Sequence, residues 1–531
     1  MTPSAARTTR PAARTTRRLM ALALAGALTA AACGGGESAL DAGDDDTEAT
    51  TSPAETSGDG TGATGDSVGS DSDVGDDESA EPTAGPTTTV APLAELPPCP
   101  VDALDAADGP VEITFWHGMA NELETALIDL VDGYNASQDR VEVVLQNQTA
   151  YESAIDKYIA GGTDSRPDII QLPEYIVQSF AQSDTFVPMQ ACIDAAGFDM
   201  EPILPRVSNT YLFEGIQWAM PFNVSSPVLF YNKQMYEAAG LDPDAPPISL
   251  DELRAVSQQL VDSGAAAHGI VLDSGRDSGG GWFFEQWFGR AGELFADNGN
   301  GRIAPATQVL FDNDTGFDIL TYLQEMTASG LAVSVGDNAG GQDAFFKMID
   351  AEAPGASTIA TSAAISSVVA ALGSGVAPGL TTDDIGIGPM PGPSDTPAVQ
   401  PGGASVWIPV GKSDEVTAAA WDFTQYLVDA QVQSTWAAAT GYVPIRTDAV
   451  ELDPIAALYE DDPRYRVAYD QMLAAADDPS SVVPALGPLR EIRAQTADAV
   501  AAAYAGGDIA SILAETADAS NALIDTYNAR N

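Results

Sequence analysis

The alternation of strand and helix patterns over residues 111–172 constrains the fold of this chain more than any other feature of its sequence. Apolar and polar residues alternate in the strand patterns, whereas apolar residues recur at helical spacing between them. The expected elements are a strand at 111–116, a helix capped by Asn121, a strand at 141–145, a helix at 151–160 and a strand at 168–172. Strand, helix and strand in this order predict an α/β fold with a mostly parallel sheet.

Several polar and aromatic residues follow the ends of these strands. Trp116, His117, Tyr151 and Glu174 all lie at or just after a strand end. Ligands of parallel sheets bind beyond the carboxyl ends of the strands. We therefore expect these residues to line a binding cleft.

The segment 221–232, PFNVSSPVLFYN, joins a small polar turn to an apolar strand. The Asn-Val-Ser-Ser turn leaves backbone N–H groups and hydroxyls for a ligand, and the strand at 227–231 is a rigid support. Such a turn can bind an anion. An ordinary loop before a buried strand has the same pattern, so the segment alone leaves both interpretations open.

The remainder of the chain is richer in helix patterns. A Gly-rich, aromatic passage at 274–292 contains Trp282 and Trp287, and a Pro/Gly-rich stretch at 386–403 precedes a strand at 405–410. Helices are expected at 250–261, 316–329, 362–372, 417–438 and towards the C-terminus.

The first 33 residues have the features of an export signal. A basic, Arg-rich start is followed by an apolar run at 19–32, and small residues precede Cys33. This arrangement resembles a bacterial lipoprotein signal, in which Cys33 takes the lipid and becomes the mature N-terminus. A simple membrane anchor or a cleaved secretory signal remains the alternative, and each places the body outside the cytoplasm.

Residues 34–95 and the overall charge restrict the partners of the chain. The segment is made mostly of Gly, Ser, Thr, Asp and Pro, so it predicts a disordered acidic tether. The whole chain carries 77 Asp and Glu against 22 Lys and Arg. Such a balance argues against nucleic acid and anionic lipid surfaces as partners. It does not exclude a small anion, which one well-placed Arg can bind.

The two remaining cysteines indicate a disulfide, and the two histidines give no indication of a metal site. Cys99 and Cys192 form an even pair in an oxidising compartment, so we expect a disulfide, with two free buried thiols as the alternative. His117 and His268, the only histidines, have no nearby Cys partners, so no metal site or cofactor is expected.

Short motifs along residues 110–530 resemble one known family. They are FWHGM near Trp116, PFNVSSPVLFYNK from Pro221, AGLDPDAPP from Ala239, PGGASVWIP from Pro401 and TGYVPI from Thr440. In this order they resemble the extracellular solute-binding proteins of ABC importers, and within them the members that bind sn-glycerol 3-phosphate. The resemblance implies a two-lobed, type II periplasmic-binding-protein-like fold, with hinge-linked α/β lobes that close over a solute.

The resemblance also implies a division of the chain. The expected parts are the signal peptide at 1–33, the tether at 34–95, lobe 1 at 96–223 with 405–446, and lobe 2 at 224–403 with 447–531. The crossings between the lobes are expected near 222–225, 403–405 and 442–446.

A set of ligand-binding residues follows from the same resemblance: Tyr151, Glu174, Ser225, Trp282, Ser362, Gly403, Tyr442 and Arg493. Tyr151 would pack against the glycerol and Glu174 would accept hydrogen bonds from its hydroxyls. Ser225 and Ser362 would bind the phosphate, to which Arg493 would offer a bidentate fork. Gly403 would supply a backbone donor that a side chain would block.

The passage around Trp282 departs from the family pattern. The glycerol 3-phosphate binders have two tryptophans close together here, and this chain retains one, with a glycine such as Gly279 at the other position. The missing indole would leave room for a larger glycerophosphodiester, for example glycerophosphocholine. Trp287 would either refill this space or pack in the core.

The leading hypothesis is a non-enzymatic, monomeric lipoprotein on the outer face of the cytoplasmic membrane. It would capture a glycerol-phosphate compound and deliver it to a membrane permease. An oligosaccharide receptor is the alternative within the class. A secreted glycerophosphodiester hydrolase and a surface adhesin are the alternatives outside it, and the hydrolase would need clusters of metal-binding carboxylates and histidines that the sequence lacks.

Overall fold

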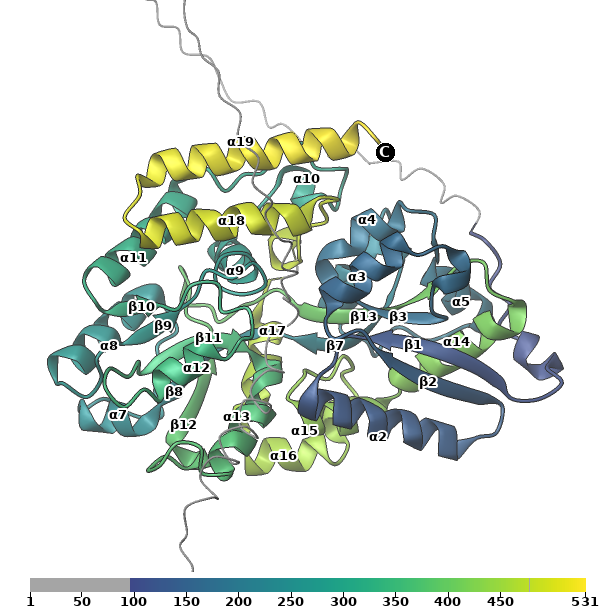
Figure 1. Cartoon of the computed structure of the whole chain (residues 1–531), viewed down its shortest axis with the longest axis horizontal. Helices are drawn as coiled ribbons and strands as arrows, with labels where there is room; N and C mark the ends of the chain where they lie inside the picture. The colour runs from purple at the N-terminus through teal and green to yellow at the C-terminus, as the bar shows by residue number, and fades with distance from the viewer. Residues whose placement is uncertain (1–95, 477) are drawn as a thin grey trace, which may run out of the picture. The chain divides into compact units, whose positions relative to one another are not determined.

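The computed structural model describes residues 96–476 and 478–531. The predicted lipidation site Cys33 and the predicted tether at 34–95 lie outside the described residues. The described body contains a six-stranded and a five-stranded sheet, each with helices packed on it (Figure 1). The predicted two-lobed α/β fold is confirmed.

The first sheet has the strand order β2-β1-β3-β13-β4, and β7 pairs with β13. Its strands are β1 (Val111–His117), β2 (Val141–Asn147), β3 (Ile169–Pro173), β4 (Phe186–Val187), β7 (Met220–Ser225) and β13 (Gly402–Pro409). Strand β1 is parallel to both β2 and β3, as the alternation of patterns predicts. Strand β13 enters antiparallel from far along the chain and binds β3, β4 and β7.

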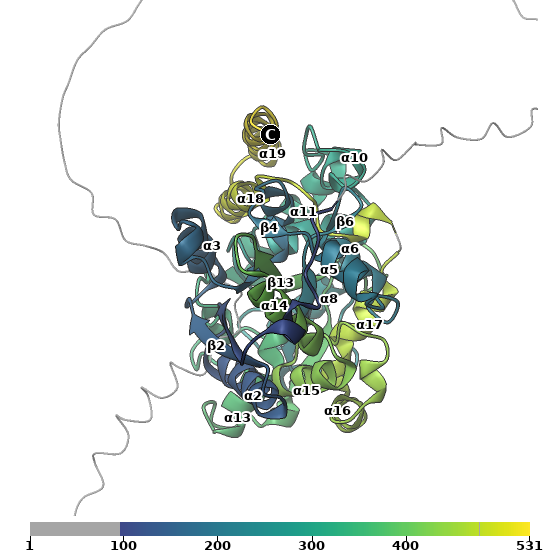
Figure 2. The ribbon, with the colours of Figure 1, turned by 90° about the vertical axis from the view of Figure 1, so that its right-hand side faces the viewer.

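Helices cover both faces of this sheet. Helix α2 (Asn121–Ser137) buries the apolar residues that mark its pattern, namely Leu123, Leu127, Leu130, Val131 and Tyr134. It begins at Asn121 itself, one residue earlier than predicted. Helix α14 (Asp414–Leu427) packs on β1 and β13, whereas α3 (Tyr151–Ala160) lies on the other face (Figures 1 and 2). Residues that follow the ends of these strands therefore lie between the helices on the two faces of the sheet.

The second sheet has the strand order β10-β9-β11-β8-β12. Its strands are β8 (Pro227–Asn232), β9 (Ile270–Leu272), β10 (Ala332–Ser334), β11 (Ser357–Thr361) and β12 (Ile385–Pro389). Strand β8 is the apolar strand of the PFNVSSPVLFYN segment, and it is buried between β11 and β12. A short hairpin of β5 (Leu212–Phe213) and β6 (Ile216–Gln217) stands apart from both sheets.

The other helices are α4 (Val177–Ala181), α5 (Met189–Ala196), α6 (Pro205–Thr210), α7 (Lys233–Ala238), α8 (Leu250–Asp262), α9 (Trp282–Ala291), α10 (Asp297–Asn300), α11 (Asp314–Ala328), α12 (Asp343–Met348), α13 (Ile365–Gly373), α15 (Ala430–Thr440), α16 (Ile455–Asp461), α17 (Val467–Ala474), α18 (Leu489–Tyr504) and α19 (Ile509–Asn528). Helices α8, α11 and α13 lie close to predicted ranges, and the helical range predicted at 417–438 corresponds to α14 and α15. Helices α18 and α19 pack on each other and on α11 (Figure 1). No helix in the described ranges is long and apolar enough to span a bilayer.

The chain passes from the first sheet to the second at a single residue. Strand β7 ends at Ser225 in the first sheet, and β8 starts at Pro227 in the second, so Ser226 connects them. The backbone N–H of Val443 donates to Val224 O at 2.7 Å beside this crossing. The segments predicted as crossings thus lie together, while the lobe boundaries themselves stay predictions.

Cys99 and Cys192 are joined by a disulfide, as predicted. Cys192 is on α5, and Cys99 lies in the segment just before the short 3₁₀ helix η1 (Ala103–Ala106). Both cysteines are buried. The bond therefore ties the start of the described body to the first lobe.

Replacing both cysteines by serine should lower the free energy of unfolding by about 2–5 kcal/mol, because the bond closes a long loop, with partners 93 residues apart. Urea denaturation of the variant and of the wild-type protein, with and without reductant, measures this change. The reduced wild-type protein should match the variant. An unchanged free energy would mean that packing alone holds the segment.

Candidate functional site

Gly403 fixes the geometry where β13 passes β7. Its φ is +97°, and a Cβ atom there would lie 2.1 Å from the carbonyl oxygen of Asn223. The strand register shifts between Ala404 and Ser405, directly after this glycine. A side chain is therefore excluded at position 403, as predicted, because both the backbone conformation and the close strand require glycine.

Ser225 and Trp282 both lie beside Gly402, the glycine that precedes Gly403. Ser225 is the cross-strand partner of Gly402, so its side chain shares a face with that position. The indole ring of Trp282 fills the space over Gly402, since a Cβ there would be 2.2 Å from Cζ2. The Ser225 hydroxyl and the Trp282 Nε1 are both buried, and neither has a hydrogen-bond partner among the described residues. Buried polar atoms normally have partners, so these two atoms are available for a hydrogen bond to a ligand group.

Tyr151 is held by a chain of side-chain amides. Gly118 N donates to Gln171 Oε1 at 3.1 Å, Gln171 Nε2 donates to Asn223 Oδ1 at 2.7 Å, and Asn223 Nδ2 donates to the Tyr151 hydroxyl at 2.9 Å. Asn223 and Gln171 are fully buried. Neither residue is in the predicted ligand-binding set. A lone polar residue inside a buried apolar strand, as Gln171 is in β3, is the signal that points to such a network.

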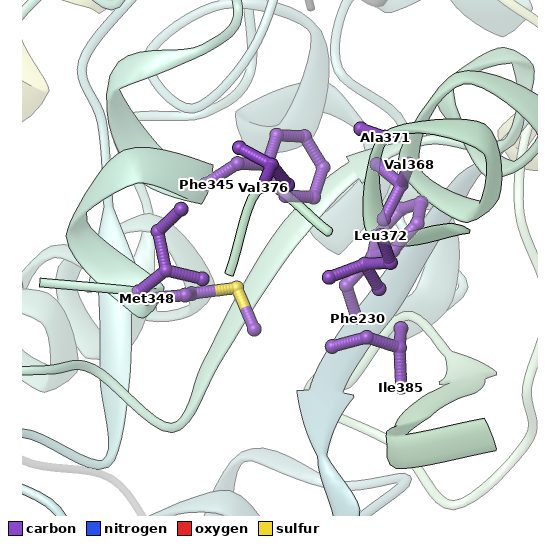
Figure 3. Close-up of a pocket in the computed structure, with 9 residues that line it drawn as sticks. Phe230, Phe345, Met348, Val368, Ala371, Leu372, Val376 and Ile385 are labelled. Atoms are coloured by element: carbon purple, nitrogen blue, oxygen red, sulfur yellow. The ribbon is translucent and has the colours of Figure 1, made fainter. Parts of the chain in front are cut away.

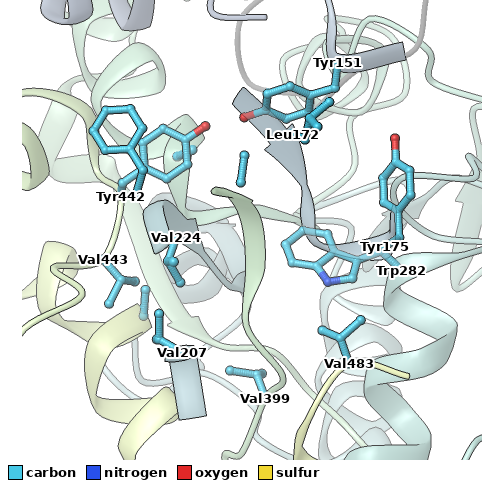
Figure 4. Packing of buried hydrophobic residues seen from close by; sticks show 14 of the residues in the cluster. Tyr151, Leu172, Tyr175, Val207, Val224, Trp282, Val399, Tyr442, Val443 and Val483 are labelled. Atoms are coloured by element: carbon cyan, nitrogen blue, oxygen red, sulfur yellow. The ribbon is translucent and has the colours of Figure 1, made fainter. Parts of the chain in front are cut away.

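Ser362 and Tyr442 lie on the other side of the crossing. Ser362, in the 3₁₀ helix η4 (Ser362–Ala364), accepts a hydrogen bond from Ser226 N at 3.3 Å and donates its own N–H to Ser226 O at 2.8 Å. A Cβ on Gly441 would approach Ser362 O to 2.8 Å. The next residue, Tyr442, stacks on Trp436 with ring centroids 5.7 Å apart. Figure 4 shows the rings of Tyr151, Tyr442 and Trp282 rising from separate elements around the strand of Val224.

Arg493 is a fully buried cation bound by two carboxylates. Its Nε and Nη2 reach the two oxygens of Glu285 at 2.7 and 2.8 Å, and its Nη1 lies 2.9 Å from Glu174. Its exposed fraction is 2 %, and the guanidinium lies over the Tyr175 ring at 5.0 Å. The fork expected for phosphate is therefore paired with Glu285. Glu285 was missed, although one acidic residue in the apolar run 282–288 signals a buried ion pair.

The two carboxylates set the electrostatics of this cluster. Burial alone would lower the pKa of Arg493, but the charges of Glu285 and Glu174 outweigh burial and raise it, so the guanidinium stays charged. Burial raises the pKa of Glu174 to about 7, although Arg493 opposes this shift. Glu174 therefore exchanges its proton near neutral pH, whereas Arg493 does not.

A second group of charges joins the two lobes. Glu152 on α3 is buried, pairs with Arg276 at 3.0 Å and with Arg490, and accepts a hydrogen bond from the Tyr175 hydroxyl. Arg490 also reaches Asp156 at 3.2 Å. Both arginines come from the part of the chain that follows the crossing at Ser226. With the Arg493–Glu174 pair, these contacts hold the facing surfaces together, and none of them was predicted from the sequence.

Two residues expected in the cleft are engaged within the first lobe. Trp116 Nε1 donates to Gln146 Oε1 at 2.8 Å, and the Lys157 ammonium lies 4.1 Å from the centre of the Trp116 ring. His117 is buried, and its Nδ1 accepts from Met119 N at 3.3 Å. Burial lowers the pKa of His117 to about 4, so the ring is neutral at pH 7. The predicted set of eight ligand-binding residues does not include these two, and it stays a prediction.

The Gly-rich passage is shaped by a buried carboxylate. Asp273 accepts hydrogen bonds from Gly275 N, Gly279 N and the Ser278 hydroxyl. A Cβ on Gly279 would lie 2.0 Å from Asp273 O, so this position has no room for a larger side chain. Trp287 is buried and donates to Pro391 O at 3.0 Å, which corresponds to the core-packing interpretation.

A separate pocket of about 40 Å³ lies between α12, α13 and the second sheet (Figure 3). Its lining is apolar and includes Phe230, Met348 and Leu372. None of the predicted site residues contributes to it. A polar solute would find no hydrogen-bonding side chain there, so the candidate site is the one around Gly403.

Replacing Gly403 by alanine should lower the free energy of unfolding by about 2 kcal/mol or more, because it adds a steric conflict to an unfavourable φ. The matched control is Gly506→Ala, since Gly506 also has a positive φ but open space around it. The control should lose only about 1 kcal/mol. Equal losses of unfolding free energy in the two variants, measured by urea denaturation, would show that the close approach to Asn223 does not destabilise the Gly403 variant.

Replacing Glu152 by glutamine should loosen the contact between the lobes, because it removes the charge on which Arg276 and Arg490 converge. Hydrogen exchange should become faster in loop 273–281, and added salt should accelerate this exchange more in the wild-type protein than in the variant. Glu325→Gln, which breaks an exposed pair with Arg254, is the control and should leave this loop unchanged. Unchanged exchange in the Glu152 variant would contradict the assignment.

The comparisons with known proteins agree with this architecture. Residues 129–467 match the family model described as bacterial extracellular solute-binding protein. The sn-glycerol-3-phosphate-binding periplasmic protein UgpB of Yersinia pseudotuberculosis is 29% identical over 409 residues, which is 74% of this chain and 88% of that protein. UgpB of Pectobacterium atrosepticum is also 29% identical, over 73% of this chain and 85% of that protein.

Solved structures show the same fold. UgpB from Mycobacterium tuberculosis in complex with glycerophosphocholine has a TM-score of 0.65 at 21% identity, covering 80% of this chain and 100% of that one. A cyclic alpha-maltosyl-1,6-maltose binding protein from Arthrobacter globiformis has a TM-score of 0.63 at 23% identity, covering 79% and 100%. The chain therefore belongs to the bacterial extracellular solute-binding proteins, the solute receptors of ABC importers.

Proposed function

We propose that this protein captures sn-glycerol 3-phosphate or a glycerophosphodiester and delivers it to the permease of an ABC importer. The observation that carries the proposal is the buried Arg493, whose Nη1 is held by a carboxylate that exchanges its proton near neutral pH. When Glu174 is protonated, a phosphate oxygen can take its place on Nη1. Glu285 then keeps Nε and Nη2, so the phosphate receives one hydrogen bond from Arg493 and not a bidentate pair.

The other groups of the site suit the rest of such a solute. The unpartnered hydroxyl of Ser225 supplies a hydrogen bond to a phosphate oxygen, and Ser362 lies across the crossing from it. The rings of Tyr151, Tyr442 and Trp282 offer apolar faces to the glycerol carbons and polar edges to its hydroxyls. A protonated Glu174 can donate to a solute oxygen, and an ionised one can accept from a solute hydroxyl.

The relatives support the same solute class. The UgpB proteins that are 29% identical over about three quarters of this chain are named for binding sn-glycerol 3-phosphate. The proposal for this chain is binding without a chemical step. In the same proposal Cys33 carries a lipid, residues 34–95 tether the receptor to the outer face of the cytoplasmic membrane, and the protein acts as a monomer.

A sugar receptor is the second candidate. Two carboxylates balance Arg493, and a site without excess positive charge suits a neutral solute. Aromatic rings also pack against sugar faces. Several proteins with this fold are named for binding maltose or related sugars.

Calorimetric titration of the full-length protein with sn-glycerol 3-phosphate, glycerophosphocholine and maltose tests the proposal. Binding of at least one of the two phosphate compounds, with no heat from maltose, is the expected result. Binding of maltose alone would replace the proposal by the sugar receptor.

Replacing Ser225 by alanine should weaken solute binding by about tenfold without lowering stability, because the hydroxyl has no partner to lose in the protein alone. Ser226→Ala is the matched control. The Ser226 hydroxyl accepts a hydrogen bond from Gln471 Nε2 at 2.8 Å, so its loss should lower the melting temperature. Calorimetry and thermal unfolding measure the two effects. A Ser225 variant with wild-type affinity would remove this residue from the site.

A further inference from the structure

Glu285 has no role in the site as described so far beyond pairing with Arg493. It is fully buried on α9, the helix that begins with Trp282, and both of its carboxylate oxygens are bound by Arg493. A carboxylate with both oxygens engaged by one guanidinium is not available to a solute. Glu285 therefore affects the solute by cancelling the positive charge of Arg493.

The balance of charge around Arg493 restricts the solute. Arg493 contributes one positive charge, Glu285 one negative charge, and Glu174 a second negative charge when it is ionised. Asp277, which is partly buried, acts on the same guanidinium and pairs with Arg276. The described cluster therefore has no net positive charge with which to balance a dianion, and a like charge brought into a buried site is strongly unfavourable.

Solutes of the proposed class differ in this respect. A phosphomonoester such as sn-glycerol 3-phosphate carries close to two negative charges above neutral pH, whereas a phosphodiester carries one. In glycerophosphocholine the quaternary ammonium cancels even that charge. One hydrogen bond from Arg493 Nη1 is sufficient for a monoanionic group, but it leaves the second charge of a monoester unpaired.

We infer that Glu285 determines the solute class: by neutralising Arg493 it makes the site reject dianionic phosphomonoesters and accept phosphodiesters of glycerol. This inference rests on the proposed function and adds to it a specificity-determining residue. Glu285 is a positioning residue, because it acts through Arg493 and has no free oxygen for the solute. Its readout is therefore the ratio of two affinities, which a general loss of packing would not change.

The test is calorimetry of the full-length protein at about pH 8, where a phosphomonoester is mostly dianionic. The probes are sn-glycerol 3-phosphate and glycerophosphocholine. The wild-type protein should bind the diester at least about tenfold more tightly, and Glu285→Gln should reduce this preference by about tenfold, mainly through tighter binding of the monoester. Glu285→Asp keeps the charge and should keep the preference.

A second variant tests the other carboxylate on the same arginine. Glu174→Gln removes that negative charge and keeps one acceptor oxygen, so it should also tighten binding of the monoester. A wild-type protein that binds the monoester as tightly as the diester would overturn the inference, even if Glu285→Gln does not fold. A folded Glu285→Gln protein with an unchanged ratio would overturn it as well.

Failure of the proposed function gives a different result. If the wild-type protein binds maltose and neither phosphate compound, the proposed function and the inference both fail. If it binds both phosphate compounds with equal affinity, the proposed function stands and the inference alone fails.

Discussion

The buried Arg493 is the interaction on which the rest of the site depends. A guanidinium with an exposed fraction of 2 % is tolerated only when its charge is paired, and here Glu285 and Glu174 supply that charge. The three residues come from α18, α9 and the turn after β3, so one cation connects both lobes. Glu285 fixes the position of the arginine. Burial raises the pKa of Glu174 to about 7, and in the proposed function this is the partner that a solute replaces.

Backbone geometry places the remaining groups around this cation. Gly403 brings β13 against β7, and Gly402 leaves the space that the indole of Trp282 fills. The chain then crosses at Ser226 into the second sheet. As a result, the unpartnered hydroxyl of Ser225 belongs to the last residue of β7, directly before the connecting Ser226. In the proposed function, lobe closure and solute contact therefore use the same few residues.

The sequence predicts the layered architecture but not the charge pairing. The parallel strands β1, β2 and β3 follow from local patterns of alternation, because each pattern reports the burial of its own segment. Glycine at 403 is explained by the resemblance to the family, yet its cause, the approach to Asn223, comes from a strand far along the chain. The pairing of Arg493 with Glu285 joins residues separated by 208 positions, and no local pattern encodes it. For the same reason the amide network of Gln171 and Asn223 and the contacts of Glu152 became visible only in the fold.

In the proposed function, a solute phosphate takes the place of Glu174 on Arg493 while Glu285 stays bound. A crystal structure of the protein with glycerophosphocholine would show this exchange. We expect a phosphate oxygen within hydrogen-bond distance of Arg493 Nη1 and of the Ser225 hydroxyl, with Glu285 still on Nε and Nη2. A phosphate bound away from Arg493, with the Glu174 pair intact, would show that this arginine does not bind the solute.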